Sequence, residues 1–486
     1  MPRTACDVCY NKKEKCVFDG DSAYCNFCVA HKQPCRLTRP ERRMGRPPAV
    51  KNPPHGHSGI ILGLDIPSSH KPSYSRPQKN KESIQLQTPR DLGPGAANLS
   101  SLVLLHTSAN KHHHLLNALT DRQIFYTFHR NFMIGPSFAE SFRLSIQTIL
   151  PCSIISLLKA YDAVFAVWDD VGQRVKPPEE IDLSEGRDCL KNLVQFGSTS
   201  DLLDNASILM LGQILIVYQL FTTCTSAWAI NRHAILSAKK SYSDLLAQPI
   251  FDPISITPIL FDTAESLIRR EIPVIQVPKT NRFIVDRSVG LCWSLLPLLH
   301  ELCEVSEKTK TRSGQEIQKP SQEGLSEADD AFTVVEREIR MWEPSAPPTL
   351  FEDFTSIEVA AMLTQARVYR TAALLLIHRL RYPLGVEDDV ARWHANIICA
   401  ELTGFVNLTP EDMRGLPVGL PLLVAMLETR ESASRIIRGL GLFVSHPQHL
   451  AALDSFVGLA WAARRGGFQG LWFDLVHVSL QVPVVP

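Results

Sequence analysis

Hydrophobic residues recur every three or four positions through most of the chain after residue 116, which is the spacing of an amphipathic α-helix. The clearest helix is predicted over 357–380, with Asp353 or Thr355 as its cap and Pro383 at its end. The same spacing predicts helices over 121–133, 138–149, 153–168, 206–228, 283–304, 328–342, 388–403, 419–440 and 447–464. Strand-like alternation is scarce, so the fold class is predicted to be mainly α.

Two segments depart from this amphipathic pattern. Residues 305–327 are charged and uniformly polar, which predicts a long disordered loop between helices. Residues 205–231 carry no charge and are long enough to span a bilayer. Because Gln213 and Gln219 interrupt this run and no basic flank orients it, we favour a buried helix and expect no membrane association.

Composition divides the chain into three zones. Residues 1–40 are cysteine-rich and basic, and 41–115 are rich in Pro, Ser, Gly, His and Lys. A segment of the second kind cannot bury enough apolar surface to fold, so we expect a disordered, flexible linker there. Residues 116–486 then form a large all-helical domain.

Charge is unevenly distributed although the net charge of the whole chain is zero. Residues 1–51 hold eleven Lys and Arg against five Asp and Glu, and most of this excess lies in 36–51. A basic arm of this kind is typical of a nucleic-acid-binding protein. The first thirty residues hold cysteines and lysines where a secretory signal would be apolar, which favours a reducing compartment.

Six cysteines near the N-terminus follow a repeated spacing, C-x2-C-x6-C, with eight residues between the two triplets. Each cysteine of the second triplet lies nineteen residues after its counterpart in the first. This repeat predicts a metal site with pseudo-two-fold symmetry. The six are Cys6, Cys9, Cys16, Cys25, Cys28 and Cys35.

Structural zinc takes four ligands in a tetrahedron, so two zinc ions need about eight ligand positions. Six sulfurs supply them if two cysteines bridge both metals, and the repeat makes Cys6 and Cys25 the natural pair. A single zinc ion with two spare thiols, or a disulfide knot, stays open as an alternative. The remaining cysteines are predicted to be core residues: Cys152, Cys189, Cys224, Cys292, Cys303 and Cys399.

The run CDVCYNKKEKC…CNFCVAHKQPC resembles the fungal Zn(II)2Cys6 binuclear-cluster family of transcription factors. The resemblance implies two short helices around two zinc ions, with the first helix reading a CGG-like triplet in the DNA major groove. It assigns the DNA contacts of that helix to Lys12, Lys13 and Lys15. Tyr10 departs from the pattern, since the family often has Arg there.

The basic arm suits phosphate contacts rather than base reading, and we assign those contacts to Arg36, Arg42, Arg43 and Arg46. No apolar heptad repeat is sustained over 40–115, so a zipper dimer is not expected there. The protein therefore binds DNA as a monomer, or forms a homodimer through its C-terminal domain.

The segments 339–354, 366–383 and 420–437 resemble the helical fungal-specific transcription factor domain that often follows such clusters. Within them Arg370, His378 and Arg379 are candidates for a ligand or partner surface, although structural pairing is the favoured interpretation. No catalytic signature is present, so an enzyme is not expected.

Together these features predict a nuclear regulator of RNA polymerase II genes that binds double-stranded DNA and co-regulators of the transcription machinery. The resemblance suggests control of a secondary-metabolite gene cluster, with primary metabolism or stress response as the alternative. Two other classes stay open: a zinc-dependent protein-binding scaffold, and an enzyme with an unrecognised helical site.

Overall fold

The computed structural model describes part of the N-terminal region and most of the chain after residue 115. The described residues are 9, 12, 15–17, 24–31, 35, 115–116, 119–170, 174–175, 180–197, 199–223, 226–278, 282–315, 322–413, 415–440 and 447–476. The chain divides into two units, Met1–Pro89 and Arg90–Pro486. The linker predicted over 41–115, with its boundaries, falls almost wholly outside the described residues.

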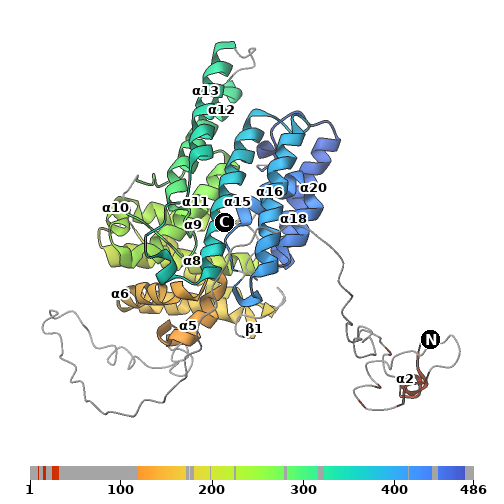
Figure 1. The fold of residues 1–486 in the computed structure, drawn as a ribbon. Helices are drawn as coiled ribbons and strands as arrows, with labels where there is room; N and C mark the ends of the chain where they lie inside the picture. The colour runs from red at the N-terminus through yellow and green to blue at the C-terminus, as the bar shows by residue number, and fades with distance from the viewer. Residues whose placement is uncertain are drawn as a thin grey trace, which may run out of the picture. The chain divides into compact units, whose positions relative to one another are not determined.

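The second unit is a helical body, by which we mean its described residues from 115 to 476 (Figure 1). Its first half contains α5 (Arg122–His129), η1 (Arg130–Phe132), η2 (Pro136–Phe138), α6 (Ala139–Ala166), α7 (Ser184–Gln195), α8 (Leu202–Thr222), α9 (Trp228–Ala238), η4 (Lys239–Ser241), α10 (Tyr242–Leu246), η5 (Pro249–Phe251) and α11 (Asp252–Arg269). Its second half contains η6 (Cys292–Leu295), α12 (Leu296–Gln315), α13 (Gln322–Met341), α14 (Leu350–Asp353), α15 (Ser356–Arg381), α16 (Asp388–Leu408), η7 (Glu411–Met413), α17 (Gly419–Glu428), α18 (Arg430–Ile437), α20 (Pro447–Arg465) and η8 (Trp472–Leu475). The mainly α fold predicted from periodicity is confirmed. A two-stranded antiparallel hairpin, β1 (Trp168–Asp170) and β2 (Arg174–Val175), was not predicted.

One continuous hydrophobic core runs through the helical body. In its first half α6 packs against α8, and in its second half α15 packs against α16 and α17. The helix predicted over 357–380 is α15, and Thr355 rather than Asp353 caps it: the Thr355 hydroxyl accepts from the Glu358 amide, while the Glu358 carboxylate accepts from the Thr355 amide.

α8 is the buried helix predicted within the uncharged run. Within the described part of the chain, two segments are long and apolar enough to cross a membrane, 136–166 and α8, and 44% and 89% of their most apolar stretches are buried inside the protein. Gln213 fits into this core because its amide group donates to the Ile254 carbonyl at 2.8 Å. α6 is bent at Ser153, two residues after Pro151, so the two helices predicted over 138–149 and 153–168 form one kinked helix.

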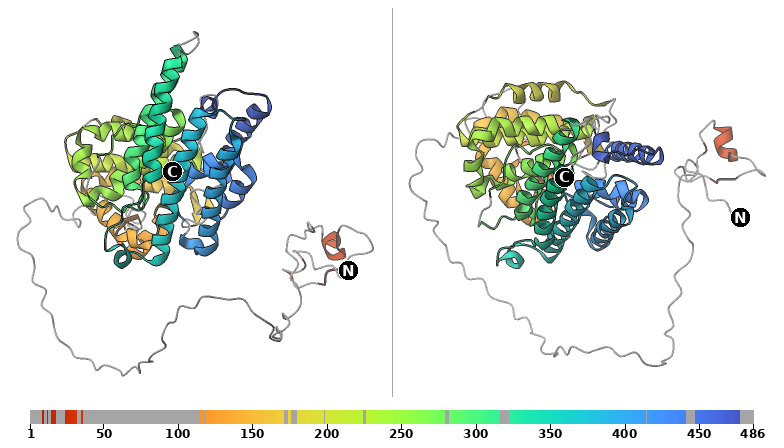
Figure 2. Two further views of the ribbon diagram at one scale, coloured as in Figure 1. Left: turned by 45° about the horizontal axis from the view of Figure 1, so that its top comes forward. Right: turned by 90° about the horizontal axis from the view of Figure 1, so that it is seen from above.

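The disordered loop predicted over 305–327 is wrong for most of its length. α12 continues to Gln315 and α13 begins at Gln322, and the two form a helical pair that projects beyond the rest of the body (Figures 1 and 2). Glu, Lys, Gln and Arg have high helix propensity, so a uniformly polar segment can extend a helix whose base is packed. Residues 316–321 lie outside the described part.

The helix predicted over 283–304 begins later, at η6. The preceding residues form a turn in which the Gly290 amide donates to the Asp286 carbonyl at 2.8 Å, with Gly290 at φ +52°. The Asp286 carboxylate accepts from the Ser288 amide at 2.9 Å. This side-chain capping competes with helix formation and holds the chain in a turn.

Four of the six cysteines predicted to be core residues are buried: Cys189, Cys292, Cys303 and Cys399. The prediction is wrong for Cys152, which is exposed beside Pro151 at the kink in α6. Cys224 lies outside the described residues.

Candidate metal centre

Three of the predicted ligands converge in the N-terminal unit. The sulfur atoms of Cys9, Cys25 and Cys28 lie within 4.8 Å of one another, and we call these three residues the sulfur cluster. The Sγ atoms of Cys9 and Cys25 are 3.5 Å apart. All three side chains are buried, and Cys16, Phe27 and Cys35 pack against them. The cluster could hold a metal ion.

Cys16 and Cys35 border the sulfur cluster, and both are half-buried against it. The Cys25 amide donates to the Cys35 Sγ atom at 3.4 Å. Among the described residues, the five cysteines of the motif are not joined by disulfides. Cys6, the sixth predicted ligand, lies outside the described residues.

A short helix, α2 (Asn26–Ala30), positions the second cysteine pair (Figure 1). Cys25 is its N-cap, and Cys28 lies in its only full turn, so the x2 spacing brings both sulfurs to one side. The Val29 amide donates to the Cys25 carbonyl at 3.0 Å. The Asn26 amide donates to the Val17 carbonyl at 2.9 Å, which joins the end of the first triplet to the start of the second.

The pKa of the Cys25 thiol is shifted by its surroundings. Burial raises its pKa, but hydrogen bonds from the Cys28 amide and from the thiols of Cys28, Cys9 and Cys16 outweigh burial and lower the pKa from 9.0 to about 6. A thiolate at the start of a helix is the ionised form that metals bind. Cys25 thus interacts with the thiols of Cys9, Cys16 and Cys28.

The spacing of the sulfurs fits a zinc-thiolate site. A tetrahedron with Zn–S bonds of about 2.3 Å has edges of about 3.8 Å, close to the separation of Cys9 and Cys25. Thiolates are soft ligands that favour zinc and other thiophilic metals over calcium or magnesium. Cys25, which touches the sulfurs of both triplets, is suited to a bridging position.

The predicted DNA contacts are described only in part. Lys12 and Lys15 are exposed, and Lys12 is itself helical. The Lys12 ammonium group stands 5.8 Å from the centre of the Phe27 ring. Phe27 was not identified as a candidate from the sequence, although its position between the two cysteines of a C-x2-C pair could have suggested a contact at this site. The other predicted contacts lie outside the described residues: Lys13, Arg36, Arg42, Arg43 and Arg46.

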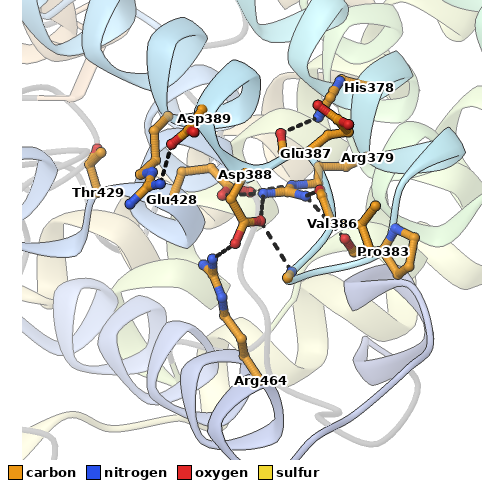
Figure 3. Close-up of polar contacts among 12 residues, drawn as sticks. His378, Arg379, Pro383, Val386, Glu387, Asp388, Asp389, Glu428, Thr429 and Arg464 are labelled. Atoms are coloured by element: carbon orange, nitrogen blue, oxygen red, sulfur yellow. Dashed lines mark hydrogen bonds and ion pairs between the residues drawn. The ribbon is translucent and has the colours of Figure 1, made fainter.

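The candidate partner surface on α15 proves to be structural. Arg379 is only 1% exposed and pairs with Glu428 on α17 and Asp388 on α16, as Figure 3 shows. Asp388 also pairs with Arg464 on α20 (Figure 3).

The other two residues of that candidate surface are paired as well. His378 interacts through Nε2 with the Glu387 carbonyl at 3.0 Å (Figure 3). Arg370 donates to the Trp342 carbonyl and the Glu343 carboxylate, each at 3.0 Å. Structural pairing, the favoured interpretation of all three residues, is confirmed.

No known protein family, curated protein or solved structure matches this chain. Function is therefore inferred from the residues and geometry of the chain itself.

Proposed function

We propose that this protein is a sequence-specific DNA-binding regulator of transcription whose N-terminal unit folds around two zinc ions. Six thiolates would hold them: Cys6, Cys9, Cys16, Cys25, Cys28 and Cys35. The observation that carries the proposal is the convergence of Cys9, Cys25 and Cys28 within 4.8 Å, in a segment whose cysteine spacing repeats after nineteen residues. Cys6 and Cys25 would bridge the two metals, and zinc would supply most of the folding free energy of this small unit.

The basic residues around the cluster suit a DNA contact. Six thiolates and two Zn²⁺ ions sum to a charge of about −2, which Lys12, Lys13 and Lys15 offset on the side that would face DNA. Guanine offers O6 and N7 acceptors in the major groove, so lysine donors there favour G-rich triplets. The exposure of Lys12 and Lys15 is consistent with this role.

The basic arm would anchor the protein without reading bases. Arg36, Arg42, Arg43 and Arg46 follow the last cysteine closely, and arginine side chains neutralise phosphates without regard to base sequence. The proposal places the protein in the nucleus, with double-stranded DNA and transcriptional co-regulators as partners. Its helical body would serve regulation, and any homodimer would form through that body. Control of a secondary-metabolite gene cluster is the favoured pathway, with primary metabolism or stress response as the alternative.

Selection of binding sites from random duplex DNA with the full zinc-loaded chain tests this function. We expect enrichment of a CGG-like triplet, and a linear fall of log K with log salt concentration for the selected duplex. The Cys25→Ser variant is the control and should lose selection. Recovery of no sequence from the zinc-loaded chain would overturn the proposal and favour a zinc-dependent protein scaffold.

A further inference from the structure

A cavity of about 90 Å³ lies in the helical body between α5, α6, α8 and α11. Its walls are mainly apolar and hold phenylalanines from four segments of the chain: Phe128, Phe132, Phe142, Phe165 and Phe261. We call it the aromatic cavity. It is unrelated to the sulfur cluster, which belongs to the other unit.

The aromatic cavity runs from a partly exposed rim to a buried floor. Phe128, Phe165 and Phe261 are half-buried, whereas Phe142 and Arg287 are 1% and 4% exposed. A ligand at the floor would be shielded from water, so any charge there would interact strongly with its surroundings.

Arg287 is held rigidly at this floor. Its Nε group donates to the Pro253 carbonyl at 3.0 Å, and its Nη1 group donates to the Phe132 carbonyl at 2.6 Å. Its Nη2 group donates to the Gln213 side-chain oxygen at 2.7 Å. The guanidinium carbon lies 3.9 Å from the centre of the Phe142 ring, on which it stacks.

The positive charge of Arg287 has no carboxylate partner within ion-pair distance among the described residues. The neighbouring Asp286 carboxylate is directed into the turn through Oδ1, which accepts from Ser288 and Val289, and its Oδ2 atom forms no hydrogen bond to Arg287. Burial lowers the pKa of Arg287 to about 10, and the charge of Asp286 only partly opposes this effect. A buried cation paired only with neutral groups is costly, and an anion would offset that cost.

The other polar groups of the cavity do not supply a charge. The His129 Nε2 atom is 2.9 Å from the Tyr161 hydroxyl, and burial, the largest effect, lowers the pKa of His129 to about 4. The hydroxyls of Thr257 and Ser288 bond to each other. Among the described residues that line the cavity, Arg287 is therefore the single charged side chain at neutral pH. Its guanidinium has five N–H groups, and three of them hold the contacts given above.

We propose that the aromatic cavity is a binding site for a small organic anion, whose apolar body contacts the phenylalanines and whose carboxylate pairs with Arg287. A water molecule needs roughly 10–15 Å³ of such a volume, so the cavity holds on the order of six to nine non-hydrogen atoms. That is the size of benzoate. The site does not depend on the proposed function, under which it would be an effector site.

Ligand-observed NMR titrations of the full chain with three probes test the site. Benzoate carries both features, benzamide lacks the charge, and acetate lacks the apolar body. We expect benzoate to bind at least about tenfold more tightly than either, since a charge-assisted hydrogen bond and buried apolar area each contribute. Equal affinity of benzoate and benzamide, or no benzoate binding up to about 20 mM, would overturn the proposal.

Three variants locate the binding. Arg287→Met should abolish the preference for benzoate, whereas Arg270→Met, at another buried arginine that bonds to Ser306 away from the cavity, should keep it. Val217→Trp fills the rim without removing the charge and should weaken benzoate binding at least about tenfold. Unchanged benzoate affinity in Val217→Trp would place the ligand elsewhere, and this variant decides the matter if Arg287→Met does not fold. Cys25→Ser should bind benzoate normally, which separates this site from the proposed DNA function.

Discussion

Arg379 donates hydrogen bonds to both carboxylate oxygens of Glu428, from Nε at 2.7 Å and from Nη2 at 2.6 Å, and both side chains are about 1% exposed. Arg379 also donates to the backbone carbonyls of Pro383 and Val386 at 3.1 and 3.0 Å. One arginine thus joins α15, the α15–α16 loop and α17. Because these partners come from different elements, Arg379 can form all of its hydrogen bonds in only one arrangement of these helices.

Removal of either partner of this pair should destabilise the helical body. Arg379→Met leaves Glu428 buried without its cation, so the free energy of unfolding should fall by about 3–5 kcal/mol, measured by urea denaturation followed by circular dichroism. The double variant Arg379→Met/Glu428→Met should recover part of this loss. Arg392→Ala, which breaks the exposed pair with Asp389 on the same α16, should cost under about 1 kcal/mol. If Arg379→Met and Arg392→Ala lowered the free energy of unfolding equally, the assignment of Arg379 to a buried ion pair would be contradicted.

Zinc content distinguishes a bridged cluster from a simpler site. The full chain should contain two zinc ions, and a chelator should unfold the N-terminal unit. Cys25→Ser should lose both metals, because Cys25 contacts sulfurs of both triplets, whereas Cys9→Ser should affect one metal more than the other. Elemental analysis of the purified chain gives the stoichiometry. One zinc ion per unaltered chain would refute the bridged arrangement.

Base reading and phosphate anchoring should respond to different substitutions. Lys13→Ala should relax the preference at one base pair and cost roughly 1–3 kcal/mol on the selected site. Arg43→Ala should weaken binding to all duplexes about equally and flatten the salt slope by about one unit. Parallel binding-site selections compare the two. If Arg43→Ala erases the sequence preference and Lys13→Ala keeps it, the two roles are reversed.

The stability of the helical body should fall in mild acid, in part through His129. Burial, opposed by the hydrogen bond to Phe125 and reinforced by Arg287, lowers the pKa of His129 from 6.5 to about 4. Between these values the unfolded chain binds the proton and the folded chain does not, so the free energy of unfolding decreases as pH falls. The contribution is about 2 kcal/mol between pH 7 and pH 5.

Urea denaturation at these two pH values measures this effect. His129→Gln should reduce the stability difference between the two pH values by about 2 kcal/mol, while Tyr161→Phe removes the hydrogen bond to His129 without removing the titrating group and should keep that difference. A pH dependence that is identical in His129→Gln and the unaltered chain would contradict the assignment. His394, whose pKa burial also lowers to about 4, accounts for part of the remaining pH dependence.

The sequence predicted the periodic helices better than the irregular segments. α15 was placed closely because its apolar spacing, Thr355 cap and Pro383 end all agree. α11 was missed because it contains Pro258 within its length, and its packing against α8, α9 and α12 offsets the lost hydrogen bond. The extensions of α12 to Gln315 and of α13 back to Gln322 were not predicted, because a polar stretch is compatible with either a loop or a solvent-exposed helix.

The sulfur cluster and the aromatic cavity also differ in how far the sequence predicts them. The candidate cysteine ligands are close to one another in sequence. Their spacing predicts that they converge, and the structure shows this convergence for Cys9, Cys25 and Cys28. Arg287 gave no such signal, since its burial depends on Gln213, Phe132 and Pro253, which lie 74, 155 and 34 residues away. A cavity is a property of packing between distant segments, and periodicity does not encode it.

The bend in α6 divides that helix into two pieces with separate opening behaviour. Pro151 has no amide proton to donate, and Ser153 has non-helical angles, φ −136° and ψ 26°, so the ladder of backbone hydrogen bonds is interrupted. Ile155, just beyond the bend, is 64% exposed, so little packing compensates there. Amide protons beside the bend should therefore exchange with solvent through local fluctuations, while those deeper in each half exchange only when the body unfolds.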